Sequence, residues 1–134
     1  MSQIFLPYGQ REYCMSDLGA VLVVEDESLI RMHAVSMFEE AGYSVLEAGN
    51  ADEAIKILES RNDIFLIFTD IDMPGSMDGL KLAWAVHDRW PPIRIVVTSG
   101  LVSPAEWQVP SGGHFVPKPY SKADIASALS RFAH

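Results

Sequence analysis

Polar side chains follow four apolar stretches of this sequence, and their chemical types suit one kind of reaction. Three are carboxylates, two are hydroxyls and one is an ammonium: Glu25, Asp26, Asp70, Thr98, Ser99 and Lys118. Two carboxylates ~5.5 Å apart repel by roughly 3 kcal/mol at an effective dielectric near 20, so three clustered acids require a cation or protons. Carboxylate oxygens suit magnesium better than zinc or copper. A carboxylate nucleophile, a divalent cation and a lysine are the groups that phosphoryl transfer requires.

Short apolar stretches alternate with helical patterns along the chain. The stretches typical of buried strands are 20–24, 43–47, 64–69, 93–98 and 115–116. Apolar residues at helical spacing occur in 27–41 and 79–89. Two further helical patterns each follow a residue that can cap a helix, Asn50 before the first and Ser121 before the second. Parallel strands need crossover connections, so this alternation predicts a parallel sheet covered on both faces. We expect an α/β, flavodoxin-like, doubly wound fold with five strands in the order 2-1-3-4-5.

The segment between Ser99 and Phe115 departs from this alternation. Two prolines and three glycines occur where a helix is expected: Gly100, Pro104, Pro110, Gly112 and Gly113. Ser103 can cap a turn with Pro104 at its first position, but the residues that follow leave room for only one or two turns. We expect the fourth helix of the fold to be short or mobile.

Composition and charge favour one soluble, acidic domain. The 134 residues fit a single domain, with 49% hydrophobic and 21% charged residues. A net charge of −8 repels phosphate backbones and anionic membranes, so we expect neither a nucleic-acid nor a membrane partner. The lone Cys14 cannot form a disulfide within the chain, which suits a cytoplasmic location. We expect a flexible extension over residues 1–18 and one domain over 19–134.

The expected topology brings the polar residues together. In an open parallel sheet, ligands bind beyond the carboxyl ends of the strands. Glu25 and Asp26 end the first strand, Asp70 the third and Thr98 the fourth, while Lys118 follows the fifth. We therefore expect them at one edge of the fold.

Four motifs in this order resemble the receiver domains of two-component response regulators. They are Val-Leu-Val-Val-Glu-Asp-Glu at 21–27, Thr-Asp-Ile-Asp-Met-Pro at 69–74 with Asp-Gly at 78–79, Val-Thr-Ser at 97–99, and Val-Pro-Lys-Pro-Tyr at 116–120. The resemblance covers roughly Leu18 to the C-terminus. It implies that Asp70 accepts a phosphoryl group from a phosphohistidine on a sensor histidine kinase or a histidine phosphotransfer protein.

The same resemblance implies roles for the other residues of the site. Mg²⁺ would be held by the side chains of Glu25, Asp26 and Asp70 and by the backbone carbonyl of Asp72. Thr98 and Lys118 would contact the phosphoryl group, Phe115 would be the aromatic switch residue, and the bond before Pro119 would be cis. Such a receiver changes its binding to a downstream protein, which the sequence does not name. It is not a dedicated enzyme, since slow loss of its own phosphoryl group is the one reaction expected.

Three other functions compete with this interpretation. Asp70-Ile71-Asp72 matches the D-x-D start of a haloacid-dehalogenase-type aspartyl phosphatase, but Pro74 stands where that family has Thr or Val. A flavin-binding flavodoxin needs a Ser/Thr/Gly-rich loop after the first strand, where this chain has acids. A receiver-like interaction module that works without phosphorylation would not need the full set of acids, hydroxyl and lysine. We expect a stand-alone receiver, because the chain ends at His134 soon after the last helix.

Overall fold

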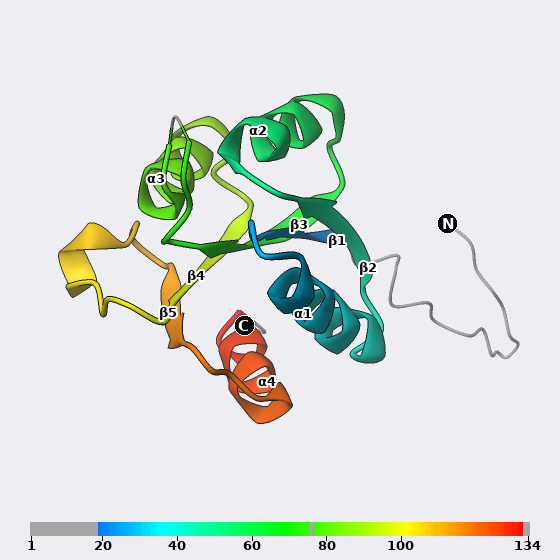
Figure 1. Cartoon of the computed structure of the whole chain (residues 1–134). Helices are drawn as coiled ribbons and strands as arrows, with labels where there is room; N and C mark the ends of the chain where they lie inside the picture. Colours follow the sequence, from blue (N-terminus) through cyan, green and yellow to red (C-terminus); the bar gives the residue numbers. More distant parts are fainter. Residues whose placement is uncertain (1–18, 76, 133–134) are drawn as a thin grey trace, which may run out of the picture.

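A parallel sheet forms the centre of the protein, whose residues 19–75 and 77–132 are described by a computed structural model. Within these residues the sheet has five strands in the order β2-β1-β3-β4-β5 (Figure 1). The strands are β1 (Ala20–Val24), β2 (Ser44–Ala48), β3 (Ile64–Asp70), β4 (Arg94–Ser99) and β5 (His114–Pro117). The helices are α1 (Ser28–Glu40), α2 (Ala51–Ser60), α3 (Gly79–Arg89), α4 (Lys122–Ser130) and the 3₁₀ helix η2 (Glu106–Gln108). The predicted fold class and strand order are confirmed.

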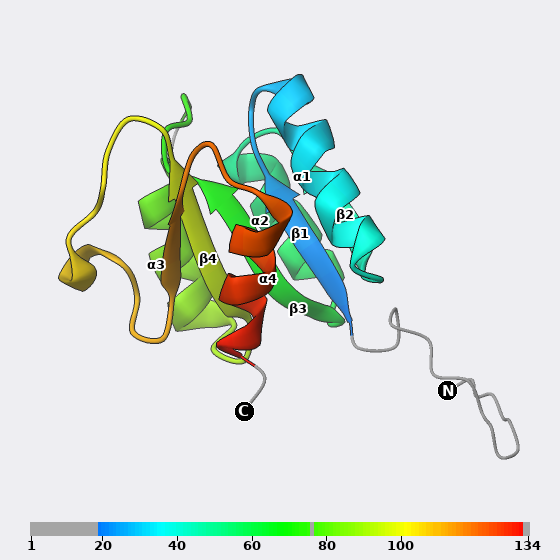
Figure 2. The same cartoon turned by 90° about the horizontal axis from the view of Figure 1, so that it is seen from below.

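Two helical layers cover the sheet, and the apolar strands face both of them. Helices α2 and α3 lie on one face and α1 and α4 on the other (Figures 1 and 2). In β1, Leu22 and Val24 join the core on the α2 and α3 side, whereas Val21 and Val23 join the core on the α1 and α4 side. The continuous apolar run of β1 therefore fills both cores, as expected for a central parallel strand.

The helices begin where side chains satisfy free backbone N–H groups. Asn50 Oδ1 accepts from the Glu53 N–H at 2.9 Å, which confirms the predicted cap of α2. At α4, Ser121 Oγ accepts from the Asp124 N–H, while the Asp124 carboxylate accepts from the Ser121 N–H. These caps fix the entry of each helix from the carboxyl edge of the sheet.

Gly79 allows α3 to begin directly against the end of β3. A Cβ atom at this position would lie 1.8 Å from the backbone oxygen of Asp70 and 2.8 Å from Ile71 Cα. No side chain fits at such a distance, so the close approach requires glycine. The helix start thereby fixes the backbone at Asp70.

The crossover between β4 and β5 contains η2 in place of a full helix. The expected short fourth helix is confirmed as the single turn η2, which begins at Glu106 and not at Pro104. Gln108 closes this turn, since its Oε1 accepts from the Ala105 N–H at 2.8 Å. The Trp84 indole N–H of α3 donates to the Gln108 carbonyl at 2.8 Å. Both views place η2 at the side of the molecule where β5 forms the sheet edge (Figures 1 and 2).

Some predictions concern residues outside the described ranges. The extension over residues 1–18, including Cys14, lies there, so both the extension and the domain boundary at residue 19 stay predictions. Among the described residues, no helix is both long and apolar enough to cross a bilayer.

Candidate functional site

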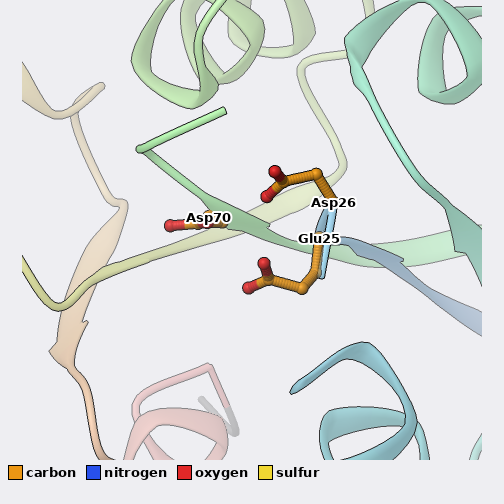
Figure 3. A group of neighbouring side chains, drawn as sticks. All are labelled: Glu25, Asp26 and Asp70. Atoms are coloured by element: carbon orange, nitrogen blue, oxygen red, sulfur yellow. The ribbon is translucent and has the colours of Figure 1, made fainter. Parts of the chain in front are cut away.

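Three carboxylates gather at the carboxyl ends of β1 and β3, two neighbouring strands. Glu25 and Asp26 directly follow β1, and Asp70 is the last residue of β3. One carboxylate oxygen from each lies within 4.8 Å of the others. Figure 3 shows Glu25 and Asp26 extending from the end of β1 toward the side on which Asp70 lies. Glu25 and Asp70 are buried, whereas Asp26 is exposed, so this acid cluster faces solvent through Asp26.

The ammonium group of Lys118 reaches the acid cluster from the loop after β5. Lys118 Nζ donates to Glu25 Oε1 at 2.9 Å and lies 3.3 Å from Asp70 Oδ2. Its backbone N–H donates to the Ser99 carbonyl at 3.0 Å, which fixes the start of the side chain beside β4. A cavity of about 520 Å³ opens beside Lys118, and Leu29, His33 and Gly100 also line it. The lysine is therefore paired with two acids and reachable from solvent.

Burial sets the protonation of the site. It raises the pKa of the Asp70 carboxyl above its ordinary value, although the Asp72 N–H and Lys118 oppose the shift. Burial also raises the pKa of Glu25 against the opposing hydrogen bond from Lys118. Burial alone would lower the pKa of Lys118, but its hydrogen bonds and charge interactions with Glu25 and Asp70 raise it above the ordinary value. The ammonium stays charged, and the site favours additional positive charge.

Thr98 places a buried hydroxyl beside the phosphoacceptor candidate. It is the register partner of Asp70 across the β3–β4 pair, and its carbonyl accepts from the Ile71 N–H at 2.8 Å. Thr98 Oγ1 is buried without a hydrogen-bond partner among the described residues. A buried hydroxyl without a partner is costly, so this atom fits a ligand that brings an acceptor oxygen.

Of the remaining predicted residues, Asp72 contacts Asp70 and Pro119 follows Lys118, whereas Phe115 belongs to the core. The Asp72 N–H donates to Asp70 Oδ1 at 3.1 Å, so the peptide after Ile71 turns toward the acid cluster. Phe115 is half-buried and packs against the core on the α2 and α3 side. The Lys118–Pro119 peptide bond is cis.

Two side-chain contacts at the site were not predicted from the sequence. The hydrogen bond from Lys118 to Glu25 is one, and the bonds of Ser99 Oγ to Asp72 and the following loop are the other. The sequence signal for both is position, because all four residues lie at or just beyond strand ends. Their specific pairing depends on side-chain directions that spacing alone does not define.

The fold and the acid cluster define a parallel α/β domain with an oxygen-rich site at the carboxyl edge of its sheet. The family model described as the response regulator receiver domain matches residues 21–130. The chain belongs to this family. The match spans the acid cluster, Thr98 and Lys118.

Similar proteins agree with this assignment. The sensor kinase CckA of Brucella abortus is 32% identical over 119 residues, which cover 86% of this chain and 12% of that protein. A response regulator receiver domain protein from Clostridium thermocellum has a TM-score of 0.77 at 25% identity, covering 84% of this chain and 92% of that one. The response regulator TrrA of Thermotoga maritima in complex with Mg(2+)-BeF has a TM-score of 0.73 at 26% identity, covering 84% and 97%.

The first curated relatives are longer than this chain. This chain spans 12% of the length of the sensor kinase CckA. It spans 24% and 25% of the lengths of two similar response regulators. The likeness therefore concerns their receiver domains.

Proposed function

We propose that this receiver is the phosphoacceptor of a two-component phosphorelay and that Asp70 is the residue phosphorylated. One observation carries the proposal: Lys118 Nζ lies 3.3 Å from Asp70 Oδ2, at a carboxylate that shares its space with Glu25 and Asp26. This combination offers a nucleophile, a cation site and a fixed positive charge within one small space.

The proposed reaction transfers a phosphoryl group to Asp70, with Lys118 and Thr98 beside it. A carboxylate oxygen of Asp70 attacks the phosphorus of a phosphohistidine on the donor protein. The new O–P bond forms as the P–N bond breaks, and the donor imidazole leaves with the electron pair and takes up a proton from solvent. Lys118 then pairs with an oxygen of the transferred phosphoryl group, and Thr98 Oγ1 donates to another. The product is an aspartyl phosphate whose charge Lys118 offsets in part.

The acid cluster fits a hard divalent cation. Its donors are all oxygens, which supports a cation of this kind. Burial raises the pKa of Glu25 and of Asp70, and a bound cation would offset the cost of keeping these buried carboxylates charged. We assign Mg²⁺ to the carboxylates of Glu25, Asp26 and Asp70 and to the backbone carbonyl of Asp72. When bound, the cation would offset the negative charge of the acids and of the phosphoryl oxygens. The similarity to the Thermotoga maritima protein in complex with Mg(2+)-BeF supports this assignment.

The phosphodonor in this proposal is a sensor histidine kinase or a histidine phosphotransfer protein in the cytoplasm. Similarity to the sensor kinase CckA supports a donor of this class. Asp26 is exposed, so the acid cluster is open to the solvent from which a donor side chain would approach. Phosphorylation then changes the binding of a downstream protein, with Thr98 and Phe115 as the switch residues.

Intact mass spectrometry tests the proposal. After incubation with Mg²⁺ and acetyl phosphate, the wild-type protein is expected to gain the mass of one phosphoryl group, and chelation of Mg²⁺ is expected to suppress the gain. Asp70→Asn should show no gain, whereas Asp88→Asn, which alters an exposed acid on α3, should match the wild type. An equal gain in Asp70→Asn would contradict the assignment of the site.

A second assay separates the receiver from its rivals. With a small phosphate ester as substrate, a receiver releases no steady stream of phosphate, whereas an aspartyl phosphatase does. Sustained turnover that is lost in Asp70→Asn would point to the phosphatase. A wild-type protein that neither gains mass nor turns over the ester would point to an interaction module that works without phosphorylation.

A further inference from the structure

Arg31 of α1 joins the end of β1 to the edge strand β2. Its Nη1 donates to the backbone carbonyl of Glu25 at 2.8 Å, and its Nε donates to Glu47 Oε1 on β2 at 3.1 Å. A guanidinium group carries its donors in a rigid plane, so one arginine can hold two acceptors in a fixed relation. Arg31 therefore fixes the direction of the Glu25 carbonyl relative to β2.

Every polar group of Glu25 has a partner. Its backbone N–H donates to the Ala48 carbonyl at 3.1 Å, and its own carbonyl accepts from Arg31. One carboxylate oxygen accepts from the Glu27 N–H at 3.1 Å, and the other accepts from Lys118 Nζ at 2.9 Å. The turn that leads from β1 to α1 is therefore held from β2, from α1 and from the loop after β5.

Asp26 lacks comparable side-chain support. Its carboxylate is exposed and makes no hydrogen bond or ion pair with the residues that the structure describes. The peptide bond between Glu25 and Asp26 is planar, so the direction of the Glu25 carbonyl also sets the direction in which the chain enters Asp26. Figure 3 shows the two carboxylates leaving the end of β1 in different directions. A rotation of this peptide would therefore move Asp26 relative to Asp70.

We propose that Arg31 is a positioning residue for the cation site and that Glu47 keeps its guanidinium group in place. Through the Glu25 carbonyl, the arginine holds Asp26 at the distance from Asp70 that Mg²⁺ requires. The inference rests on the proposed function in one respect, namely that the acid cluster binds Mg²⁺. This ion needs near-ideal octahedral geometry at about 2.0–2.1 Å, whereas Ca²⁺ accepts flexible geometry at about 2.3–2.6 Å. A fixed Asp26 therefore favours Mg²⁺ over Ca²⁺.

The charge of Arg31 by itself would have the opposite effect. A positive charge near the acid cluster repels cations, so its removal alone would strengthen the binding of Mg²⁺ and of Ca²⁺ alike. Loss of positioning instead weakens the binding of Mg²⁺, and it weakens Mg²⁺ more than Ca²⁺. Replacement of a residue that orients metal ligands typically costs about 10- to 100-fold in affinity. The sign of the change and the preference between the two ions therefore separate positioning from charge.

NMR titrations of the ¹⁵N-labelled full chain with MgCl₂ and with CaCl₂ test the proposal. In Arg31→Met, we expect the Kd for Mg²⁺ to rise about tenfold and the Kd for Ca²⁺ to rise less than about threefold. Arg89→Met is the matched control, because this arginine also pairs with a glutamate, Glu59 at 2.9 Å, but lies at the C-terminal end of α3. The control should keep both wild-type Kd values. Unchanged or tighter Mg²⁺ binding in Arg31→Met, or equal weakening for the two ions, would overturn the proposal.

Variants of Glu47 test the other end of the same contact. Glu47→Gln keeps an oxygen acceptor for the arginine and should keep the wild-type ratio of the two Kd values. Glu47→Ala removes the acceptor and should lower the preference for Mg²⁺, but in the Arg31→Met background it should add nothing further. The Glu47 side chain is 50% exposed, so both variants should fold, and they decide the matter if Arg31→Met does not. Equal ratios in Glu47→Ala and Glu47→Gln would overturn the proposal.

The metal-free protein supplies a spectroscopic readout. The ¹⁵N chemical shift of the Asp26 amide reports the hydrogen bond at the Glu25 carbonyl, because that bond polarises the peptide group that the two residues share. This resonance should move in Arg31→Met and stay in place in Arg89→Met, and an unchanged resonance in Arg31→Met would overturn the inference. If the wild type binds neither ion, the metal assignment fails and the inference fails with it. Wild-type binding that Arg31→Met leaves unchanged contradicts the inference alone.

Discussion

Lys118 Nζ donates to Glu25 Oε1 at 2.9 Å and thereby joins the loop after β5 to the end of β1. In the sheet, β3 and β4 lie between these two strands, so the lysine side chain reaches across the carboxyl edge of both. The side chains of Lys118 and Glu25 are 18% and 4% exposed, respectively. One partly exposed ammonium thus compensates two buried acids, Glu25 and Asp70.

Replacement of Lys118 by methionine should destabilise the protein. Loss of the ammonium leaves Glu25 and Asp70 as buried acids without a cationic partner. We expect a loss of about 2 kcal/mol in the free energy of unfolding, below the full cost for a dry ion pair because solvent reaches Lys118. Urea denaturation measures it, with Lys81→Met on the exposed face of α3 as the control. Equal stability of the two variants would contradict the importance of the pair.

Mg²⁺ should stabilise the folded protein. The acid cluster exists only in the folded state, so a cation bound there shifts the unfolding equilibrium, by about 2.7 kcal/mol at a concentration one hundred times its Kd. Differential scanning calorimetry should show a higher Tm with Mg²⁺, a smaller increase for Asp26→Asn and the full increase for Asp88→Asn. An increase in Asp26→Asn as large as in the wild type would argue against Asp26 as a ligand.

The stability of the metal-free protein should fall as the pH rises above the ordinary carboxyl pKa. The folded-state pKa of Asp70 is raised, so between the unfolded and folded values the folded protein binds more protons than the unfolded chain. The stabilisation is therefore present at low pH and is lost as the pH rises through the raised value.

Asp70→Asn isolates this contribution. The variant lacks the buried charge, so at pH ~7 it should be more stable than the wild type by on the order of 1 kcal/mol, and the difference should shrink toward pH ~4. Urea denaturation in a chelating buffer across this range measures the difference, with Asp88→Asn as the reference. A difference that grows as the pH falls would have the wrong sign for a raised pKa.

Gly79→Ala should damage both the fold and the site. The added Cβ would meet the Asp70 backbone oxygen at 1.8 Å, so either α3 or the end of β3 must move. We expect a loss of more than about 1 kcal/mol of stability together with weaker Mg²⁺ binding. At Gly49 the nearest atom to an added Cβ is a side-chain oxygen at 3.4 Å, which makes Gly49→Ala the matched control. Wild-type stability and Mg²⁺ binding in Gly79→Ala would contradict the required close approach.

Much of the fold followed from the sequence because local signals agreed with the tertiary structure. The apolar run of β1 is buried throughout, and Asn50 and Ser121 cap the helices that they were predicted to cap. The acid cluster was predictable for a topological reason, since parallel strands bring residues at their carboxyl ends to one edge. Glu25, Asp26 and Asp70 therefore came together although Asp70 is distant in the sequence.

The contacts that were not predicted depend on side-chain directions and on the path of the loops, which residue spacing does not define. The crossover turn begins at Glu106 because Gln108 closes it from within and Trp84 of α3 binds its last residue. The partners of Ser99 likewise follow from side-chain directions and from the path of the loop after β4. Such contacts involve long-range geometry, for which a local pattern of residue types carries little information.

Chemical mapping of the phosphorylated residue tests the central claim most directly. Borohydride reduces an aspartyl phosphate to homoserine, which leaves a permanent mark at the residue that carried the phosphoryl group. After treatment with Mg²⁺ and acetyl phosphate followed by borohydride, peptide mass spectrometry should find homoserine at position 70 and aspartate at positions 26 and 72. An unchanged Asp70 beside a mark at another acid, or no mark on any residue, would contradict the account.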